Sequence, residues 1–357
     1  MRRPATVAFL TFCAAATAAA ADPLRDQANG LFEPIPEAAP ALPGNPAIPE
    51  KIALGRMLYF DPRLSESRAM SCNTCHNISM GGVRASPAER GPLGGRNVPT
   101  VLNAVFNNSQ FWDGRAADLK EQAVTSVMAN PKALIPARGG AIIPSPAEMN
   151  IARQHAVEEL KTIPGYVDAF KKAFPSEADP VSYDNVGRAI AVFEATLTTP
   201  GAPFDRWLKG DDNALSDTQK QGLKIFIDKG CSNCHNGINM GGGMFARFGV
   251  AKDPGPELLP PDDVGRFAIT KEASGKYVFK VPSLRNVELT APYFHSGHIF
   301  DLKQAIAVMG ESQLGQKLDE GERDKIAAFL TSLTGRQPEI TLPILPPRGA
   351  ATPRPQP

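Results

Sequence analysis

The sequence predicts an all-α protein built from two similar helical units in tandem, with little or no β structure. Three observations lead to this prediction: the pentapeptide C-x-x-C-H occurs once in each half, its surroundings are repeated, and apolar residues recur at helical spacing between Pro and Gly breaks. Helices are predicted over residues 50–60, 116–129, 147–161, 164–174, 181–198, 203–209, 215–229, 301–310 and 319–334. Strand-like alternation is clear only at 277–281, where we expect at most a short hairpin.

The two pentapeptides hold most of the cysteines in the chain. They are Cys72-Asn73-Thr74-Cys75-His76 and Cys231-Ser232-Asn233-Cys234-His235. In this signature two thiols bond covalently to a haem and the adjacent histidine ligates its iron. Zinc held by two C-x-x-C pairs is the alternative, but the histidine after both pairs argues against it. We therefore predict two covalently attached c-type haems.

The ends of the chain are predicted to lie outside the helical units. Met1 to Arg3, an apolar stretch and small residues up to Ala21 form the pattern of a secretory signal, residues 1–21, too short to span a bilayer. Export together with covalent haem indicates the periplasm. Proline crowds residues 22–48 and 336–357, which we expect to be an extended lead-in and a loose tail. The net charge of +1 predicts neither nucleic acid nor membrane as a partner.

The surroundings of the two motifs are duplicated. From Val98 and Val281 onward the halves align without a gap at an offset of 183 residues. The offset pairs Asn103 with Asn286, Phe111 with Phe294, and Gly114 with Gly297. Each copy is therefore expected to be one haem-binding domain, residues 49–200 and 201–335. We expect the last helix of the second domain to pack back on the first.

The two copies differ where a second iron ligand is needed. Met309 follows a predicted helix in the second copy, and its thioether is suited to complete the ligation of haem 2. The same offset places Ser126, a poor iron ligand, in the first copy. Trp112 stands where the second copy has His295, and an indole between two haems provides a path for electrons. Haem 1 is thus predicted to be the more open site.

These residues resemble the bacterial dihaem cytochrome c peroxidases from about residue 49 to residue 335. The specific stretches are residues 96–104 (RNVPTVLNA), 110–115 (QFWDGR), 291–297 (APYFHSG) and 308–310 (VMG). The resemblance implies two cytochrome c-like domains, a relay haem 2 ligated by His235 and Met309, and a peroxidatic haem 1 ligated by His76. It also implies hydrogen peroxide as substrate, a small soluble cytochrome c or copper protein as electron donor, and a homodimer.

Further site residues follow from the resemblance. Asn97, Thr290 and Pro292 match the positions whose oxygens hold a calcium ion, a cation that prefers such ligands. Trp112 is expected between the haems, and Gln122 is expected to line the peroxide pocket.

Peroxide reduction also needs a group that moves a proton between the two oxygens. Family members carry a glutamate in an Asn-Pro-x-Glu-Met segment, whereas Lys132 follows Asn130-Pro131 here, and Glu148-Met149 restores the pattern downstream. We interpret residues 132–146 as an insertion and Glu148 as the acid/base. A solvated glutamate at a helix start is the alternative interpretation.

One departure from the family affects activation. Many members keep a distal histidine after the first haem motif, but residues 77–111 contain none. We therefore expect haem 1 to stay open in the fully oxidised enzyme, which would need no reductive activation. His155 is expected to be a surface or packing residue. Two other functions remain open: an oxidase that matures a quinone cofactor on a partner protein, a class with tyrosine in place of Met309, and a non-catalytic dihaem electron carrier.

Overall fold

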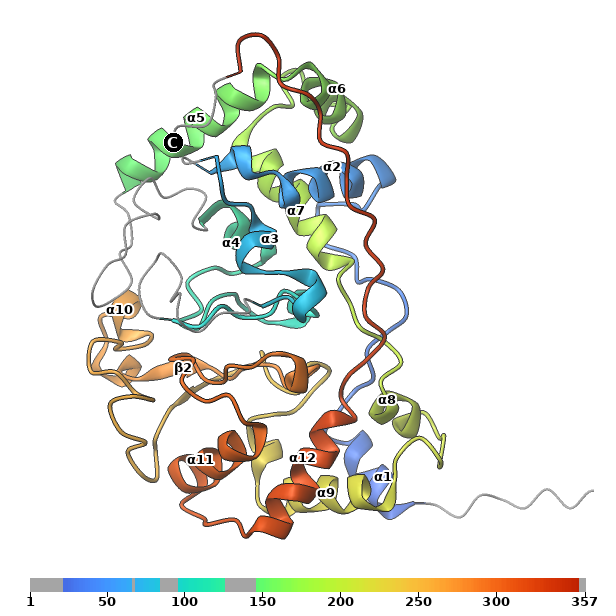
Figure 1. The fold of residues 1–357 in the computed structure, drawn as a ribbon, viewed down its shortest axis with the longest axis vertical. Helices are drawn as coiled ribbons and strands as arrows, with labels where there is room; N and C mark the ends of the chain where they lie inside the picture. The colour runs from blue at the N-terminus through green and yellow to red at the C-terminus, as the bar shows by residue number, and fades with distance from the viewer. Residues whose placement is uncertain (1–21, 66–67, 84–95, 126–145, 353–357) are drawn as a thin grey trace, which may run out of the picture.

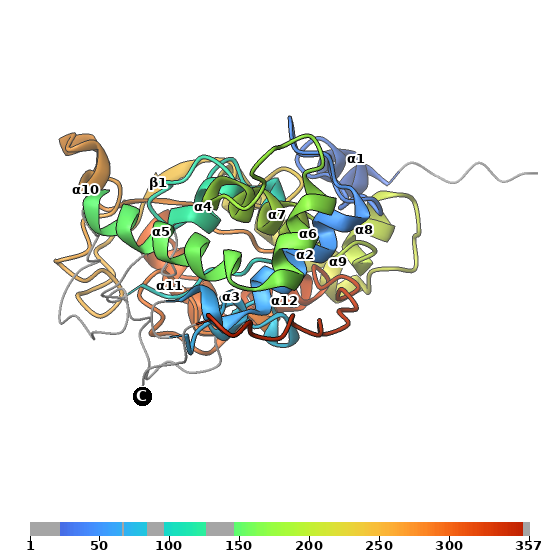
Figure 2. The same cartoon turned by 90° about the horizontal axis from the view of Figure 1, so that it is seen from above.

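The computed structural model describes residues 22–65, 68–83, 96–125 and 146–352, with the backbone alone for 146–152. The signal, Ser126 and nearly all of the 132–146 insertion lie outside these ranges. Two helical halves are stacked along the long axis of the molecule (Figure 1). Seen from the end, α2, α5 and α6 cover the N-terminal half (Figure 2). The elements are α1 (Pro23–Asn29), α2 (Pro49–Phe60), α3 (Cys72–Cys75), α4 (Leu119–Thr125), α5 (Pro146–Lys161), α6 (Pro164–Ala173), α7 (Tyr183–Ala195), α8 (Pro203–Leu208), α9 (Asp217–Asp228), α10 (Phe267–Thr270), α11 (Leu302–Leu314), α12 (Glu320–Thr331), β1 (Phe245–Arg247) and β2 (Val278–Lys280).

The N-terminal core forms where α2 crosses α7. A Cβ atom added to Gly55 would lie 1.9 Å from the carbonyl oxygen of Ala189, so only glycine lets these two backbones approach so closely. Around this crossing, buried apolar residues of α2, α6 and α7 make one cluster, which includes Leu54, Tyr59 and Phe193. Burial of this apolar surface holds α2 and α7 together.

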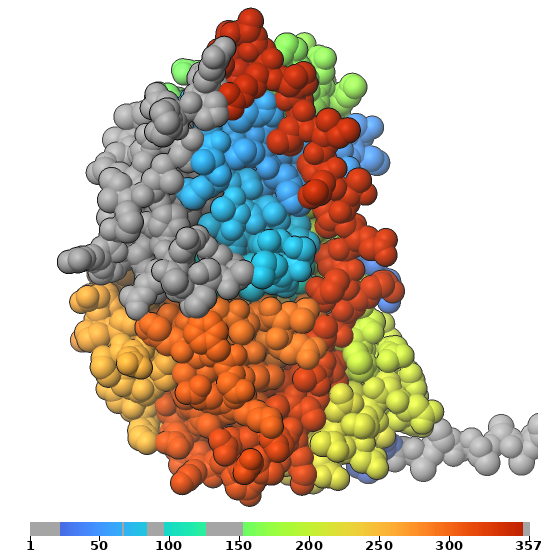
Figure 3. Space-filling model, in the orientation of Figure 1, coloured from blue at the N-terminus to red at the C-terminus, as the bar shows by residue number. Residues whose placement is uncertain are grey.

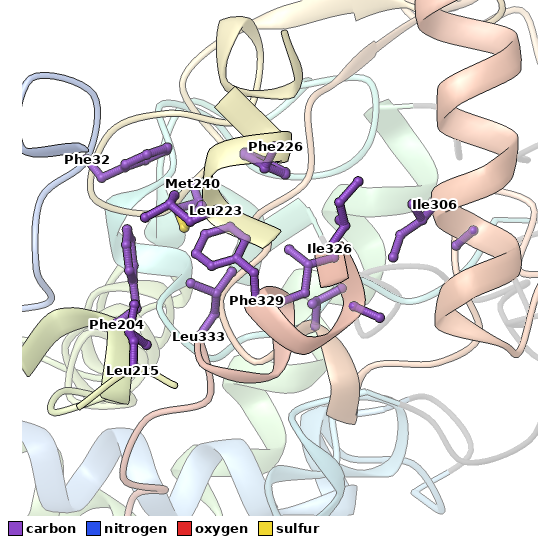
Figure 4. Packing of buried hydrophobic residues seen from close by; sticks show 14 of the residues in the cluster. Phe32, Phe204, Leu215, Leu223, Phe226, Met240, Ile306, Ile326, Phe329 and Leu333 are labelled. Carbon is purple, nitrogen blue, oxygen red and sulfur yellow. The ribbon is translucent and has the colours of Figure 1, made fainter. Parts of the chain in front are cut away.

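The C-terminal core repeats this arrangement with α9 and α12. A Cβ atom on Gly222 would lie 1.9 Å from the carbonyl oxygen of Lys325. The ring of Phe329 packs 5.4 Å from that of Phe226 and 5.2 Å from that of Phe204, measured between centroids. Figure 4 shows Phe329 inside this cluster. In both halves, therefore, a glycine allows two helices to cross at the same close distance.

The duplication extends to the loop backbone. Asn103 and Asn286 adopt left-handed φ values of 59° and 58°, and Phe111 and Phe294 adopt 67° and 66°. In both halves a short 3-10 turn follows the asparagine, at Ala104–Phe106 and Val287–Leu289. Matching residues therefore have matching conformations, which is what the offset of 183 predicts.

The predicted all-α class is confirmed, and nearly all the helix boundaries fall within a few residues of those expected. In the described residues the regular β structure is one antiparallel pair, β1 with β2. The strand predicted at 277–281 is present, but its partner lies about thirty residues upstream. Helix α11 continues four residues beyond the expected end at Gly310. There a Cβ atom would lie 2.9 Å from the carbonyl oxygen of Gln316, so this glycine accommodates the following loop rather than ending the helix.

The lead-in is not simply an extended chain. Residues 23–29 form α1, and Ala28 and Phe32 are buried in the C-terminal core. The Phe32 ring meets the Phe204 ring edge-on at 5.5 Å. Arg285, itself buried, donates from Nη2 to the carbonyl of Glu33 at 2.8 Å. Apolar burial and this hydrogen bond hold the segment in spite of its prolines.

The tail also packs against the protein. It contacts the N-terminal half, which is the contact that we expected the last helix to make. Helix α12 packs on α9 and α11 of its own half, whereas residues 336–352 return along the N-terminal half. Arg63 Nη1 donates to the Pro346 carbonyl at 2.9 Å, and Thr162 and Thr352 hydroxyls lie 2.9 Å apart. Ile340 packs against the N-terminal core. We call residues 336–352 the C-terminal strap; it crosses the molecular surface in Figure 3.

Candidate functional site

The residues predicted to hold haem 2 surround one cavity. Cys231 comes three residues after the end of α9, next to a left-handed Gly230, and begins a 3-10 turn that ends at Asn233. Cys231, Cys234 and His235 line a cavity of about 250 Å³, and Met309 of α11 lines the same cavity. Two thiols for covalent attachment, with an imidazole and a thioether as iron ligands, are the groups that a c-type haem with His and Met ligation requires. The residues therefore fit this group.

The orientation of His235 suits an iron ligand. The ring is 9% exposed, and its Nδ1 donates to the carbonyl oxygen of Met240 at 3.3 Å. This hydrogen bond leaves Nε2 as the free lone pair. Burial lowers the pKa of His235 to about 4, so the imidazole is neutral at pH 7. Burial likewise raises the pKa of the Cys231 thiol to about 11.

The first motif has a similar arrangement, with a short α-helix in place of the 3-10 turn. Cys72 to Cys75 form the short helix α3, and His76 Nδ1 donates to the carbonyl of Pro99 at 2.9 Å. Burial lowers the pKa of His76 to about 4. The Tyr59 hydroxyl donates to the His76 carbonyl at 2.6 Å and thereby anchors the motif to α2. These residues fit a second covalent haem.

Aromatic side chains join the two halves beside the cavity. Trp112 Nε1 donates to the Asn97 carbonyl at 2.9 Å, and its ring lies 6.1 Å from that of His295. His295 is 3% exposed and stacks on Phe279 at a centroid distance of 4.0 Å. Both Trp112 and His295 line the cavity. The indole thus lies at the boundary between the two halves and next to the haem 2 residues.

The three residues expected to bind calcium come together at the same boundary. Asn97, Thr290 and Pro292 all line the cavity. The Asn97 amide donates from Nδ2 to the carbonyls of Pro292 and Phe294. Asn97 and Pro292 are thus in contact across the boundary between the halves, and Thr290 lines the same cavity.

An ionic cluster that sequence reasoning missed fixes the halves against each other. Arg96 donates to Asp263 at 2.6 and 2.8 Å and to Asp113 at 2.6 Å, and Arg115 donates to Asp113 at 2.9 Å. Burial alone would raise the pKa of Asp263, but its hydrogen bonds and ion pair with Arg96 lower it overall. Arg96 and Asp113 belong to motifs recognised in the sequence, whereas Asp263 follows a proline-rich loop and gives no signal.

The proposed peroxide residues are only partly described. Gln122 lies on α4 and is not among the residues that line the cavity beside the haem 2 residues, so its place in a peroxide pocket stays a prediction. Glu148 is in the first turn of α5, and its side chain lies outside the described residues. His155, on the same helix, is exposed, as expected for a surface residue.

A duplicated helical fold with a covalent haem motif in each half defines a dihaem c-type oxidoreductase. The profile of a family described as "Di-haem cytochrome c peroxidase" matches residues 49–213. The chain is 51% identical to the cytochrome c551 peroxidase of Pseudomonas aeruginosa over 94% of both chains, and 43% identical to that of Nitrosomonas europaea over 100% of this chain and 99% of the relative. It is also 36% identical to the methylamine utilization protein MauG of Methylorubrum extorquens, over 94% of each. The chain belongs to the di-haem cytochrome c peroxidase family.

It is accordingly a peroxidase that carries two c-type haems and takes hydrogen peroxide as its substrate. Solved structures share the fold. A MauG-like protein associated with microbial copper homeostasis superposes with a TM-score of 0.69 at 24% identity, covering 84% of this chain and 95% of that one. The dihaem peroxidase BthA of Burkholderia thailandensis superposes with a TM-score of 0.65 at 18% identity, and the match covers 85% of this chain and 90% of that one. Within the described residues, no helix has the length and apolar character needed to cross a membrane.

Proposed function

We propose that two unequal sites divide the work of this peroxidase in the periplasm, within domains at 49–200 and 201–335. When bound, the haem at Cys231 and Cys234 supplies electron relay, and the haem at Cys72 and Cys75 supplies peroxide reduction. One observation carries the proposal: Met309 lines the cavity of His235, whereas the first copy has Ser126 at the matching position. The relatives named cytochrome c551 peroxidases support a small c-type cytochrome as donor over a copper protein.

Met309 is proposed to close the relay site against peroxide. Substitution by alanine should abolish the methionine-to-iron absorption band and lower the potential of that haem, because thioether ligation raises it. Met244, a partly exposed methionine near β1, offers a matched control. A Met309→Ala protein that keeps the band would contradict the ligand assignment.

Glu148 is proposed as the acid/base that takes a proton from the inner peroxide oxygen and delivers it to the outer one. Acid/base groups of this kind contribute about 10²–10⁴-fold to rate. We expect Glu148→Gln to lower kcat by about that factor in stopped-flow oxidation of a reduced small cytochrome by peroxide. Glu158→Gln, at an exposed position on the same helix, should keep the wild-type rate. Equal rates in the two variants would remove Glu148 from the mechanism.

The chain is proposed to need no reductive activation, because residues 77–111 offer no imidazole for a second ligand. The oxidised protein should show a high-spin signal in its EPR spectrum and react with peroxide without prior reduction. A purely low-spin spectrum with protein ligands at both irons would refute this proposal.

Calcium is proposed at Asn97, Thr290 and Pro292, since amide and carbonyl oxygens are ligands that it favours. Chelation should weaken coupling between the halves, and Asn97→Ala should reproduce the effect without chelator. Peroxidase activity that is unchanged by both treatments would contradict the site. A homodimer is also proposed, to be measured by sedimentation with and without calcium.

The oxidase function remains a second candidate because MauG is 36% identical to this chain and the loop histidine is missing. Met309 favours the peroxidase, since that oxidase class has tyrosine at this position. Peroxide-driven oxidation of tryptophans on a partner protein, in place of cytochrome oxidation, would support the second candidate. A non-catalytic carrier would show neither reaction.

A further inference from the structure

The cavity that holds the haem 2 residues contains a buried ammonium group. Lys280 lies on β2 and lines the cavity, yet only 6% of its surface is exposed. Burial lowers the pKa of Lys280 to about 8, so the side chain remains mostly charged at pH 7. In the described part of the chain its ammonium has no ion-pair partner. A buried charge without a partner is costly, and proteins retain such groups when a ligand supplies the opposite charge.

The lining of the cavity indicates what kind of ligand it suits. None of the described residues that line it is Asp or Glu, and its charged side chains are Lys280 and Arg247. Arg247 is exposed, on β1. The rest of the wall is largely apolar. A ligand that suits this cavity is flat and apolar with an anionic edge, and a haem has that character because its ring carries two propionates.

The repeat places Lys280 beside haem 2 rather than haem 1. Lys280 stands two residues before Pro282, whose counterpart Pro99 accepts the hydrogen bond from His76 in the first half. The backbone of Pro282 also lies next to the His235 ring, whose Nδ1 donates to Met240. The counterpart of Lys280 itself is Asn97. The same position thus carries a cation in the second copy and, in the first, an amide that we have proposed to hold one.

We propose that Lys280 binds a propionate carboxylate of the haem attached at Cys231 and Cys234, and so raises the reduction potential of that haem. The inference rests on the proposed relay site. A nearby positive charge favours the reduced iron, because reduction lowers the charge of the haem by one unit. Lys280 is therefore a positioning and tuning residue, which touches the cofactor edge but not the substrate.

A redox titration followed at each haem tests this proposal without peroxide. Lys280→Met should lower the high-potential midpoint by at least a tenfold change in the reduction equilibrium, which is about 59 mV for one electron. Lys280→Arg keeps the positive charge, so its high-potential midpoint should stay close to that of the wild type. Lys271→Met, which removes an exposed lysine nine residues away, should leave both midpoints unchanged. An unchanged high-potential midpoint, or a shift confined to the low-potential haem, would overturn the assignment.

A second measurement covers the case in which Lys280→Met fails to fold. Lys280→Arg keeps the charge but changes the hydrogen bond, so the propionate bending band of haem 2 in the resonance Raman spectrum should move. An unmoved band would refute the contact. Both readouts are independent of peroxide turnover, and loss of Met309 ligation would appear separately in the absorption spectrum. Failure of this inference can therefore be told from failure of the proposed function.

Discussion

Replacing Gly222 by alanine should destabilise the C-terminal core. The new Cβ atom would lie 1.9 Å from the Lys325 carbonyl oxygen and 2.9 Å from the Cβ atom of Phe329. Ordinary contact begins near 3.4 Å, so α9 and α12 must separate by about 1.5 Å. Overpacking of this kind costs about 3 kcal/mol when backbone must move. For a unit of this size the melting temperature should fall by about 6–12 °C.

Thermal unfolding of the haem-loaded protein measures this effect, with the absorption of each haem reporting on its own half. Gly321→Ala is the matched control, because it adds a methyl group to α12 where the nearest atom is Asp319 Oδ1 at 3.4 Å. It should match or slightly exceed the wild type. Gly55→Ala should lower the melting temperature of the N-terminal half instead. If Gly222→Ala unfolds at the wild-type temperature, the close helix crossing is not a constraint on stability.

Two further predictions concern stability. Burial raises the pKa of Glu194 from 4.5 to about 8, so the folded state binds the proton more tightly and stability is lost as pH rises from about 4.5 to about 8. In urea titrations at pH 7, the free energy of unfolding of Glu194→Gln should therefore exceed that of the wild type by on the order of 3 kcal/mol, and at pH 4 the two should be equal. Equal differences at both pH values would contradict the reasoning. Deleting residues 338–357 should destabilise the N-terminal core, with about 1 kcal/mol lost for each hydrogen bond from the strap to that core. The melting of the C-terminal half should stay unchanged; a loss shared equally by both halves would contradict this.

The sequence predicted the helices that carry long apolar periodicity, such as α7 and α9, because burial of one face determines both pattern and structure. It could not reveal α1, which has seven residues followed by proline-rich chain. The partner strand Phe245–Arg247 was missed for a related reason: three residues after a glycine run are too few to show alternation. Short elements are stabilised by contacts that are distant in the sequence.

The sequence predicts the haem-attachment residues because covalent attachment requires a fixed local spacing, and the repeat then leads to the prediction that Met309 is a ligand. The burial of Lys280 and Asp263 could not be predicted, since a lysine near a strand end and an aspartate after prolines both have the sequence pattern of solvated residues. Their burial depends on the packing of one half against the other. The strap was misjudged because its hydrogen-bond partners, including Arg63 and Thr162, belong to distant parts of the chain.

The buried asparagines of the repeat meet at one residue. Asn103 and Asn286 are 0% exposed, and each donates from Nδ2 to the hydroxyl of Thr199, at 2.7 and 2.9 Å. A duplicated unit would be expected to bring its own acceptor for each amide, but here both copies depend on the same oxygen. Cutting the chain near residue 200 would therefore leave one half with a buried amide lacking its acceptor. The C-terminal copy thus depends on the N-terminal copy for the packing of its buried polar groups, and it does not carry a complete set of its own.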